Sequence, residues 1–181
     1  LVLDVLGLSA GAARVRAGRR DGANVACRGT SEAVEAHTRA RELYHAVGDD
    51  REMSAWSNLG NALMRLGRPA EATQALAQAL ELCRAKGNRH GEAIVLNNLG
   101  TARQMAGEGA EAIEAFAKAL EIYRDFDDSF GVGQTLENLA RIHRRERRPA
   151  EARTAYLQAA EAFTRANAPA EASRCQDCAT R

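Results

Sequence analysis

A forty-residue internal repeat is the feature that most constrains how this chain can fold. Three copies of one pattern of small and large apolar residues follow one another in phase, so that Leu59-Gly60, Leu99-Gly100 and Leu139-Ala140 occupy the same place in successive copies. The other repeated positions are Leu76, Phe116 and Tyr156; Ala72, Ala112 and Ala152; Ala75, Ala115 and Ala155; and Ala79, Ala119 and Ala159. A fixed period of about 20 to 50 residues is typical of a solenoid, in which each unit buries its apolar face against the next.

The composition predicts that the repeated units are helical. Of the 181 residues, 45% are hydrophobic but only 4% are aromatic, so the core must consist mainly of alanine and leucine. Both are strong helix formers, and runs of β-branched residues, which favour strands, are missing. Within each copy the apolar residues recur at intervals of three or four, as on one face of a helix. We therefore predict an all-α protein of antiparallel helix pairs, each with a front helix followed by a back helix.

Turn signals divide the chain into six segments. Gly67-Arg68-Pro69 and Arg147-Arg148-Pro149 are predicted to join front and back helices, because proline suits the first turn of a helix. Glycines oppose a long helix in residues 1–30, where a degenerate helix and a mobile arm both stay open. The predicted segments are this N-terminal stretch at 1–30, the second helix of an incomplete repeat at 31–48, full units at 49–86, 87–126 and 127–166, and a capping helix or the start of a fourth repeat at 167–181.

The small residues that follow the repeated leucines predict where the helices come closest. Two helices approach to about 8–10 Å where the residues at their contact are small. Each front helix is therefore expected to meet its own back helix at this position, while the larger apolar residues fill the space between units. The predicted facing pairs are Gly60 with Ala72, Gly100 with Ala112, and Ala140 with Ala152.

Charge and hydropathy exclude two classes of partner. The net charge is +1, so no overall field favours nucleic acid. No run of about 18 apolar residues occurs, so we predict no membrane span. The four cysteines are too few and too scattered for a disulfide framework, which favours a reducing cytoplasmic location.

No group of residues predicts catalysis or metal binding. Cys175 and Cys178 form a lone C-x-x-C pair, and a zinc site would need two further ligands nearby. Aligned with the third unit, they fall on the positions of Leu136 and Leu139, which favours two buried thiols. The histidines show no metal spacing, and no phosphate-binding glycine loop, nucleophile elbow or paired acidic motif occurs. We therefore predict no metal, no cofactor and no enzymatic activity.

The repeated pattern resembles the tetratricopeptide repeat (TPR) over residues 49–166, and more weakly over 31–48 and 167–181. The resemblance implies a right-handed superhelical α-solenoid. The period of forty exceeds the family's usual value of about 34 and is similar to the form found in bacterial signalling regulators and in motor-cargo and cell-polarity adaptors. The matching residues are Trp56, Leu59, Gly60, Leu63, Ala72, Leu76 and Ala79; Leu96, Leu99, Gly100, Ala112, Phe116 and Ala119; and Leu136, Leu139, Ala140, Ala152, Tyr156 and Ala159.

This resemblance also implies where a ligand would bind. The front helices of the family line its concave surface, and contacts come from residues beside the Leu-Gly pair and up to two turns later. Some members clamp a carboxylate with cations and asparagines; the matching positions here keep Asn61 and Asn98 but lack the cations, which argues against such a clamp. The predicted groove residues are Ser57, Asn58, Asn61 and Arg65; Asn97, Asn98, Thr101 and Gln104; and Gln134, Glu137, Asn138, Arg141, Arg144 and Arg145.

Asn58, Asn98 and Asn138 stand one residue before the repeated leucines and form a ladder. An asparagine side chain offers both a donor and an acceptor, so it can hold a peptide unit on both sides. Front helices about 10 Å apart match three extended residues of about 3.3 Å each, so the ladder could grip a segment of about seven residues. The alternative is that these asparagines bridge neighbouring helices.

The third unit carries the densest positive charge, and Arg141, Arg144 and Arg145 are expected to face the groove. They favour a subsite for acidic side chains or phosphate, although basic residues also suit the end of a helix.

Three functions follow as hypotheses. The first is a module that binds a peptide or partner protein segment in its concave groove. The second is a regulatory segment of a larger signalling NTPase or transcription regulator. The third is self-association through the incomplete terminal repeats, which would make a homo-oligomer.

Overall fold

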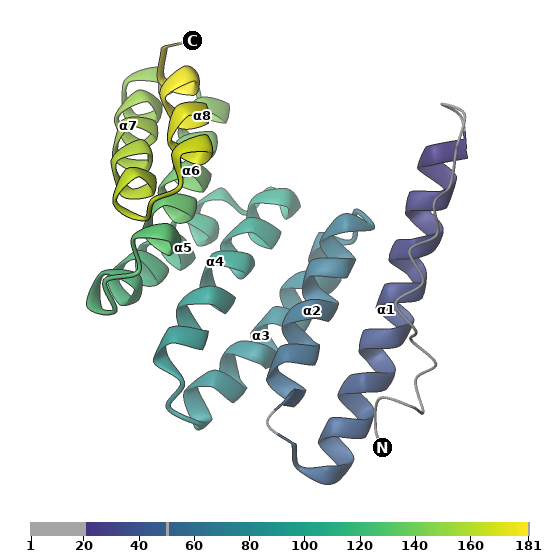
Figure 1. The fold of residues 1–181 in the computed structure, drawn as a ribbon. Helices are drawn as coiled ribbons and strands as arrows, with labels where there is room; N and C mark the ends of the chain where they lie inside the picture. The colour runs from purple at the N-terminus through teal and green to yellow at the C-terminus, as the bar shows by residue number, and fades with distance from the viewer. Residues whose placement is uncertain (1–20, 50, 181) are drawn as a thin grey trace.

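A computed structural model of the chain describes residues 21–49 and 51–180, with side chains from Thr30 onward. The described residues form eight α-helices joined by short turns and contain no strand (Figure 1). The helices are α1 (Asp21–Val47), α2 (Arg51–Arg65), α3 (Pro69–Ala85), α4 (Arg89–Ala106), α5 (Gly109–Asp125), α6 (Ser129–Arg145), α7 (Pro149–Arg165) and α8 (Pro169–Thr180).

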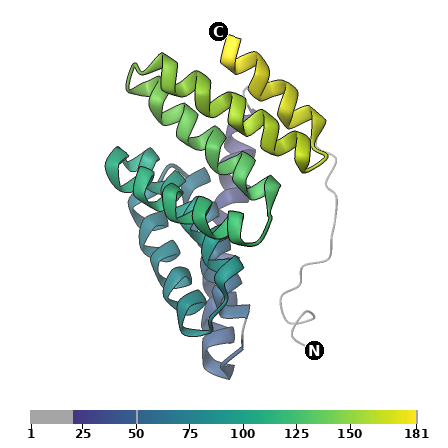
Figure 2. The ribbon, with the colours of Figure 1, turned by 90° about the vertical axis from the view of Figure 1, so that its left-hand side faces the viewer.

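Successive helices run antiparallel and stack side by side from α1 to α8 (Figure 1). The front helices are α2, α4, α6 and α8, and the back helices are α1, α3, α5 and α7. Front helices of neighbouring units contact each other, α2 with α4 and α4 with α6, whereas the back helices α3, α5 and α7 pack on front helices. The front helices therefore lie on the inner, concave side of the array. Figure 2 shows the last helices crossing the direction of the first, as in a twisted solenoid. The predicted all-α solenoid is confirmed.

The turns keep the forty-residue register even where the residue type changes. In the turn after α6, Arg147 adopts a positive φ of 58°. Gly107, which holds the same place one unit earlier, has a φ of 88°. Asn167 likewise adopts a φ of 55° before α8, forty residues after Asp127. This register corrects the alignment of the last helix: Cys175 occupies the place of Thr135 and is buried, while Cys178 occupies the place of Asn138 and is only half-buried.

The first helix differs from the prediction. We expected a boundary between residues 30 and 31, but α1 runs without interruption from Asp21 to Val47. The glycines within 21–29 therefore do not end the helix, despite their low helix propensity. The sequence leaves two alternatives open for residues 1–30, a degenerate helix and a mobile arm, and residues 1–20 of that segment lie outside the described part. The exposed residues of the last helix, α8, are mostly polar, which suits a terminal cap.

The close approach of front and back helices occurs at the predicted glycines but against different partners. A Cβ added at Gly100 would lie 2.6 Å from a ring carbon of Phe116, and one added at Gly60 would lie 2.6 Å from Leu76 Cγ. The facing residues are thus the large ones, Leu76 and Phe116, rather than the predicted alanines. At Gly60 and Gly100 the large side chain takes the space that a Cβ would occupy.

An ion-paired glutamate joins the first and second units on the back-helix side. Glu92 of α4 is buried and accepts hydrogen bonds from Arg84 Nε at 2.9 Å and from Arg89 Nη1 at 2.8 Å. Burial by itself raises the pKa of Glu92, but the hydrogen bonds from the two arginines outweigh burial and hold this pKa below its ordinary value. The ionised form is therefore the one that the fold stabilises.

Glu92→Gln should lower the free energy of unfolding at pH 7 by about 1–3 kcal/mol, because it leaves buried hydrogen-bonding groups poorly matched. A depressed pKa in the folded state contributes stability above the unfolded-state pKa of about 4.3, and this contribution disappears as pH falls through the folded-state pKa. Urea unfolding at pH 7 and at pH 3 should therefore show a difference between wild type and variant that shrinks in acid. The exposed Glu121→Gln is the control, and an equal difference at both pH values would contradict the assignment.

The described residues hold neither a membrane-spanning helix nor a group of metal ligands. No helix in that part of the chain is long and apolar enough to cross a membrane. No three histidine, cysteine, aspartate or glutamate side chains of the described residues come together as metal ligands.

Candidate partner-binding groove

The predicted groove residues fall into three groups by exposure. The exposed ones are Asn58, Arg65, Gln134, Arg141, Arg144 and Arg145. Those that are half-buried are Ser57, Asn61, Asn98, Thr101, Gln104 and Asn138. Asn97 and Glu137 are buried, with exposed fractions of 9% and 7%. The concave face is therefore not a uniform row of available side chains.

Asn97 connects two front helices. Its Oδ1 lies 3.1 Å from the hydroxyl of Thr135, which is fully buried on α6, and it accepts a hydrogen bond from Asn138 Nδ2 at 3.3 Å. Thr101 also turns inward, donating its hydroxyl to the backbone oxygen of Asn97 at 3.1 Å. Asn97 thus closes the space between α4 and α6 and has little exposed surface left for a ligand.

Glu137 occupies the same repeat position one unit later and also reaches the next front helix. It accepts hydrogen bonds from Arg141 at 2.6 Å and from Arg174 of α8 at 2.8 Å. Both arginines are about half exposed, while the carboxylate is buried. Glu137 therefore holds α8 on α6 and, like Asn97, has little exposed surface left for a ligand.

The three asparagines of the ladder differ in whether their side chains are hydrogen-bonded. The amide nitrogen of Asn138 is used on Asn97, which is the helix-bridging alternative. Neither Asn58 nor Asn98 makes a side-chain hydrogen bond within the described part of the chain. Three residues at one repeat position therefore have different availability, because only Asn138 has a hydrogen-bonding neighbour on the preceding front helix.

The third-unit arginines are also engaged. Arg141 pairs with Glu137, Arg144 lies over the ring of Tyr156 at 5.8 Å, and Arg145 Nη1 donates to the backbone oxygen of Gln104 at 3.1 Å. They do not converge as three free guanidinium groups. The expected subsite for acidic groups would therefore have to compete with these contacts within the protein.

At the N-terminal end of the groove, polar side chains surround two cavities. A cavity of about 500 Å³ opens between α1 and α2, and a second one of about 160 Å³ opens between α2 and α4. Asn58 lines both. The first cavity is lined by Thr30, Ala33, His37, Asn58, Asn61, Ala62 and Arg65, and the second by Met53, Ser54, Ser57, Asn58, Gly91, Ile94 and Val95.

The side chains around these two cavities combine polar and apolar character. Asn61 and Arg65 have no hydrogen bond or ion pair among the described residues. Burial lowers the pKa of His37, so its ring is neutral at pH 7 and can both donate and accept. Ile94 is 43% exposed beside the second cavity. Such a surface offers hydrogen bonds to a backbone and a contact for an apolar side chain.

Sequence reasoning missed several residues that shape this face. Thr135 and Arg174 decide whether Asn97 and Glu137 are free, and His37 lines the first cavity from α1. One signal was available: Glu137 is a charged residue at the repeat position that holds Ser57 and Asn97 in the earlier units, and Arg174 follows 37 positions later. His37 carried no such signal, because α1 was assigned to an incomplete repeat.

The comparisons with known proteins agree with this architecture. A family model described as tetratricopeptide repeat matches residues 51–125 and 91–165. No curated protein matches the chain in sequence.

Solved structures share the fold at low sequence identity. A putative kinesin light chain with nearly identical TPR-like repeats from Podospora anserina superposes with a TM-score of 0.62 at 17% identity, over 90% of this chain and 89% of that one. BtubC (BKLC) from P. vanneervenii gives 0.56 at 16% identity, over 88% and 90% of the two chains. MamA gives 0.53 at 18% identity, over 92% and 95%. With the family model covering residues 51–165, the chain belongs to the tetratricopeptide repeat family.

Proposed function

We propose that this chain is a protein-interaction module that binds an extended segment of a partner protein at the N-terminal end of its concave groove. TPR-like repeat proteins generally mediate protein–protein interactions. The observation that carries the proposal is the set of unpaired side chains on α2, Asn58, Asn61 and Arg65, around two adjoining cavities.

The chemistry of these cavities favours a peptide backbone with one apolar side chain. The two asparagines can each donate to a carbonyl and accept from an amide. Ile94 supplies an apolar contact at the same place, and Arg65 favours an acidic group beside it. The C-terminal half of the groove offers less, because Asn97, Glu137 and Asn138 are already bonded between helices.

The proposal is tested by selecting a displayed random-peptide library on the full chain and measuring the affinity of an enriched peptide by fluorescence anisotropy. The double variant Asn58→Ala and Asn61→Ala should weaken that affinity by about tenfold or more, since two hydrogen bonds are lost. Asn138→Ala is the matched control and should leave the affinity unchanged, because its side chain bonds to Asn97.

Circular dichroism establishes that each variant keeps its helical content. An absence of any enriched motif would refute the groove proposal. Equal weakening by Asn138→Ala and by the α2 double variant would instead show that the peptide spans the whole ladder, contrary to the proposed location.

A further inference from the structure

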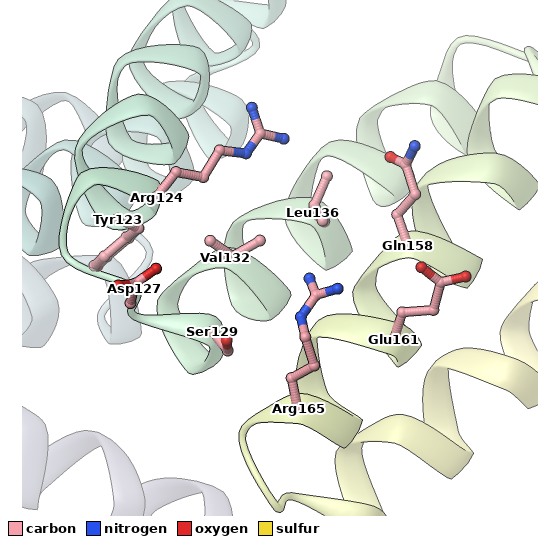
Figure 3. A pocket seen from close by; sticks show the side chains of 9 residues that line it. All are labelled: Tyr123, Arg124, Asp127, Ser129, Val132, Leu136, Gln158, Glu161 and Arg165. Carbon is pink, nitrogen blue, oxygen red and sulfur yellow. The ribbon is translucent and has the colours of Figure 1, made fainter.

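A second cavity system lies on the opposite, convex side of the array. A cavity of about 440 Å³ opens between the back helices α5 and α7, and its floor is the face of α6 that points away from the groove (Figure 3). Its lining residues are Tyr123, Arg124, Asp127, Ser129, Val132, Leu136, Gln158, Glu161 and Arg165. The preceding units show what normally occupies this place.

In both earlier junctions a carboxylate of the front helix pairs with a basic residue of the preceding back helix. His45 of α1 lies 3.0 Å from Glu52 of α2, and Arg84 of α3 lies 2.9 Å from Glu92 of α4. The two glutamates are forty residues apart. Each basic residue stands three positions before a turn residue with positive φ, Gly48 or Gly87. The pairing is therefore part of the repeat.

At the third junction the basic residue is kept and the carboxylate is lost. Arg124 stands three positions before Asp127, whose φ is 52°, so it is the counterpart of Arg84. The counterpart of Glu92 is Val132, which cannot pair with it. Arg124 has no ion pair among the described residues. The cavity therefore stands where the two earlier junctions hold a carboxylate.

A second arginine, Arg165, adds positive charge to the same cavity. In Figure 3, Arg124 from α5 and Arg165 from α7 extend into the space between the two helices, on either side of Val132. Arg165 also has no ion pair within the described part. The acidic lining residues Asp127 and Glu161 are not within ion-pair distance of either arginine, and the carboxylate of Glu161 turns away from Val132 toward Gln158. These two acids limit the site to ligands of low negative charge.

The cavity continues into a mainly aliphatic groove, which also carries His143, Glu151 and Thr154. An adjoining cavity of about 390 Å³ between α6 and α7 shares Leu136 and Gln158 with the first. Leu139 and Ala155 line it further along. A ligand that places one carboxylate at the arginines can therefore lay an aliphatic group on Leu136 and Leu139.

We propose that this convex groove is a second docking site, which takes a protein segment that carries one glutamate side chain next to aliphatic residues. The glutamate supplies from outside the carboxylate that Glu52 and Glu92 supply from inside at the two earlier junctions. Carboxylate and guanidinium form charge-assisted hydrogen bonds, and the valine floor accommodates the methylene groups of the glutamate stem. The site is separate from the concave groove, which lies on the other side of α6.

The test is an NMR titration of the ¹⁵N-labelled full chain with the capped peptides Ac-Glu-(Ala)n-Leu-Leu-NH₂, where n runs from none to about three. At least one peptide should bind with a Kd of about 1 mM or tighter. Its resonance shifts should cluster at residues 126–132 and 158–165. The matched Gln peptides should bind about tenfold more weakly, because the charge-assisted bond is lost.

Two variants and one control locate the site. Arg124→Gln should weaken binding about tenfold, and Val132→Glu should abolish it, because the new side chain restores the internal pair of the earlier junctions. Arg84→Gln is the matched control and should bind as wild type, since that arginine is already paired with Glu92.

Three results would overturn the proposal. The first is that no peptide, at up to about 10 mM, shifts the resonances of the two segments, because the expected Kd of about 1 mM would then be excluded. The second is unchanged binding to Val132→Glu. The third is binding of sodium butyrate as tight as that of the peptides, which would make the site one for small carboxylates rather than for a protein segment. Spectra that stay dispersed in all variants exclude unfolding as the cause of lost binding.

Discussion

Replacing Phe116 by alanine should lower the free energy of unfolding by about 3–5 kcal/mol, the range for a fully buried aromatic residue. Phe116 has no exposed surface and fills the space left open by Gly100 of its own front helix. It also packs with Ile142 of α6 in a small cluster that reaches Leu139. Its loss therefore leaves a cavity and also weakens the contact between the second and third units.

Urea unfolding followed by circular dichroism measures this effect. Because each unit of a solenoid contacts only its neighbours, a weakened junction should also broaden the transition as the third unit unfolds apart from the first. Phe126→Ala is the control: that ring is 52% exposed, and its loss should change stability by less than about 1 kcal/mol. Equal effects of the two substitutions would show that the buried ring is not a main source of stability.

Replacing Gly100 by leucine should lower the free energy of unfolding by about 3 kcal/mol, the upper part of the range for overpacked cores. Even a single Cβ at this position would lie 2.6 Å from the Phe116 ring, and a full leucine side chain has no space between α4 and α5. The better helix propensity of leucine offsets only about 1 kcal/mol of the cost. The two helices must therefore separate.

A size exchange makes this prediction specific to one contact. The double variant Gly100→Leu with Phe116→Ala should be less destabilised than the sum of the two single variants, because the leucine can fill the cavity left by the ring. Gly109→Leu is the control, since a Cβ there meets only Glu146 Oε1, at 3.4 Å. Additive losses in the double variant would mean that Gly100 and Phe116 do not act on one contact.

The sequence predicted the secondary structure and pairing of the units well because the signals for them are local. Apolar residues at intervals of three or four, and prolines and glycines at the turns, determine each helix from its own residues. The exception is α1, where glycines predicted an interruption that the helix from Asp21 to Val47 does not have.

The groove was predicted less completely than the fold. Choosing front-helix residues beside the Leu-Gly pairs identified Asn58, Asn61 and Arg65, which do line one cavity. The same choice included Asn97 and Glu137, which are buried between helices. The convex cavity was not predicted, although the change from Glu92 to Val132 at one repeat position was visible in the sequence.

The sequence by itself determined that this protein is a stack of helix pairs, where its turns fall and at which glycines its helices meet, since period, propensity and residue size act within a unit. Only the tertiary structure decided which polar side chains are left for a partner. Asn58 and Asn138 hold the same repeat position, yet Asn138 is bonded to a residue 41 positions away. Arg84 and Arg124 also hold one repeat position, but in the described part of the chain only Arg84 has a carboxylate, that of Glu92, within hydrogen-bond distance. A buried polar group needs a partner, and that partner is set by proximity in space.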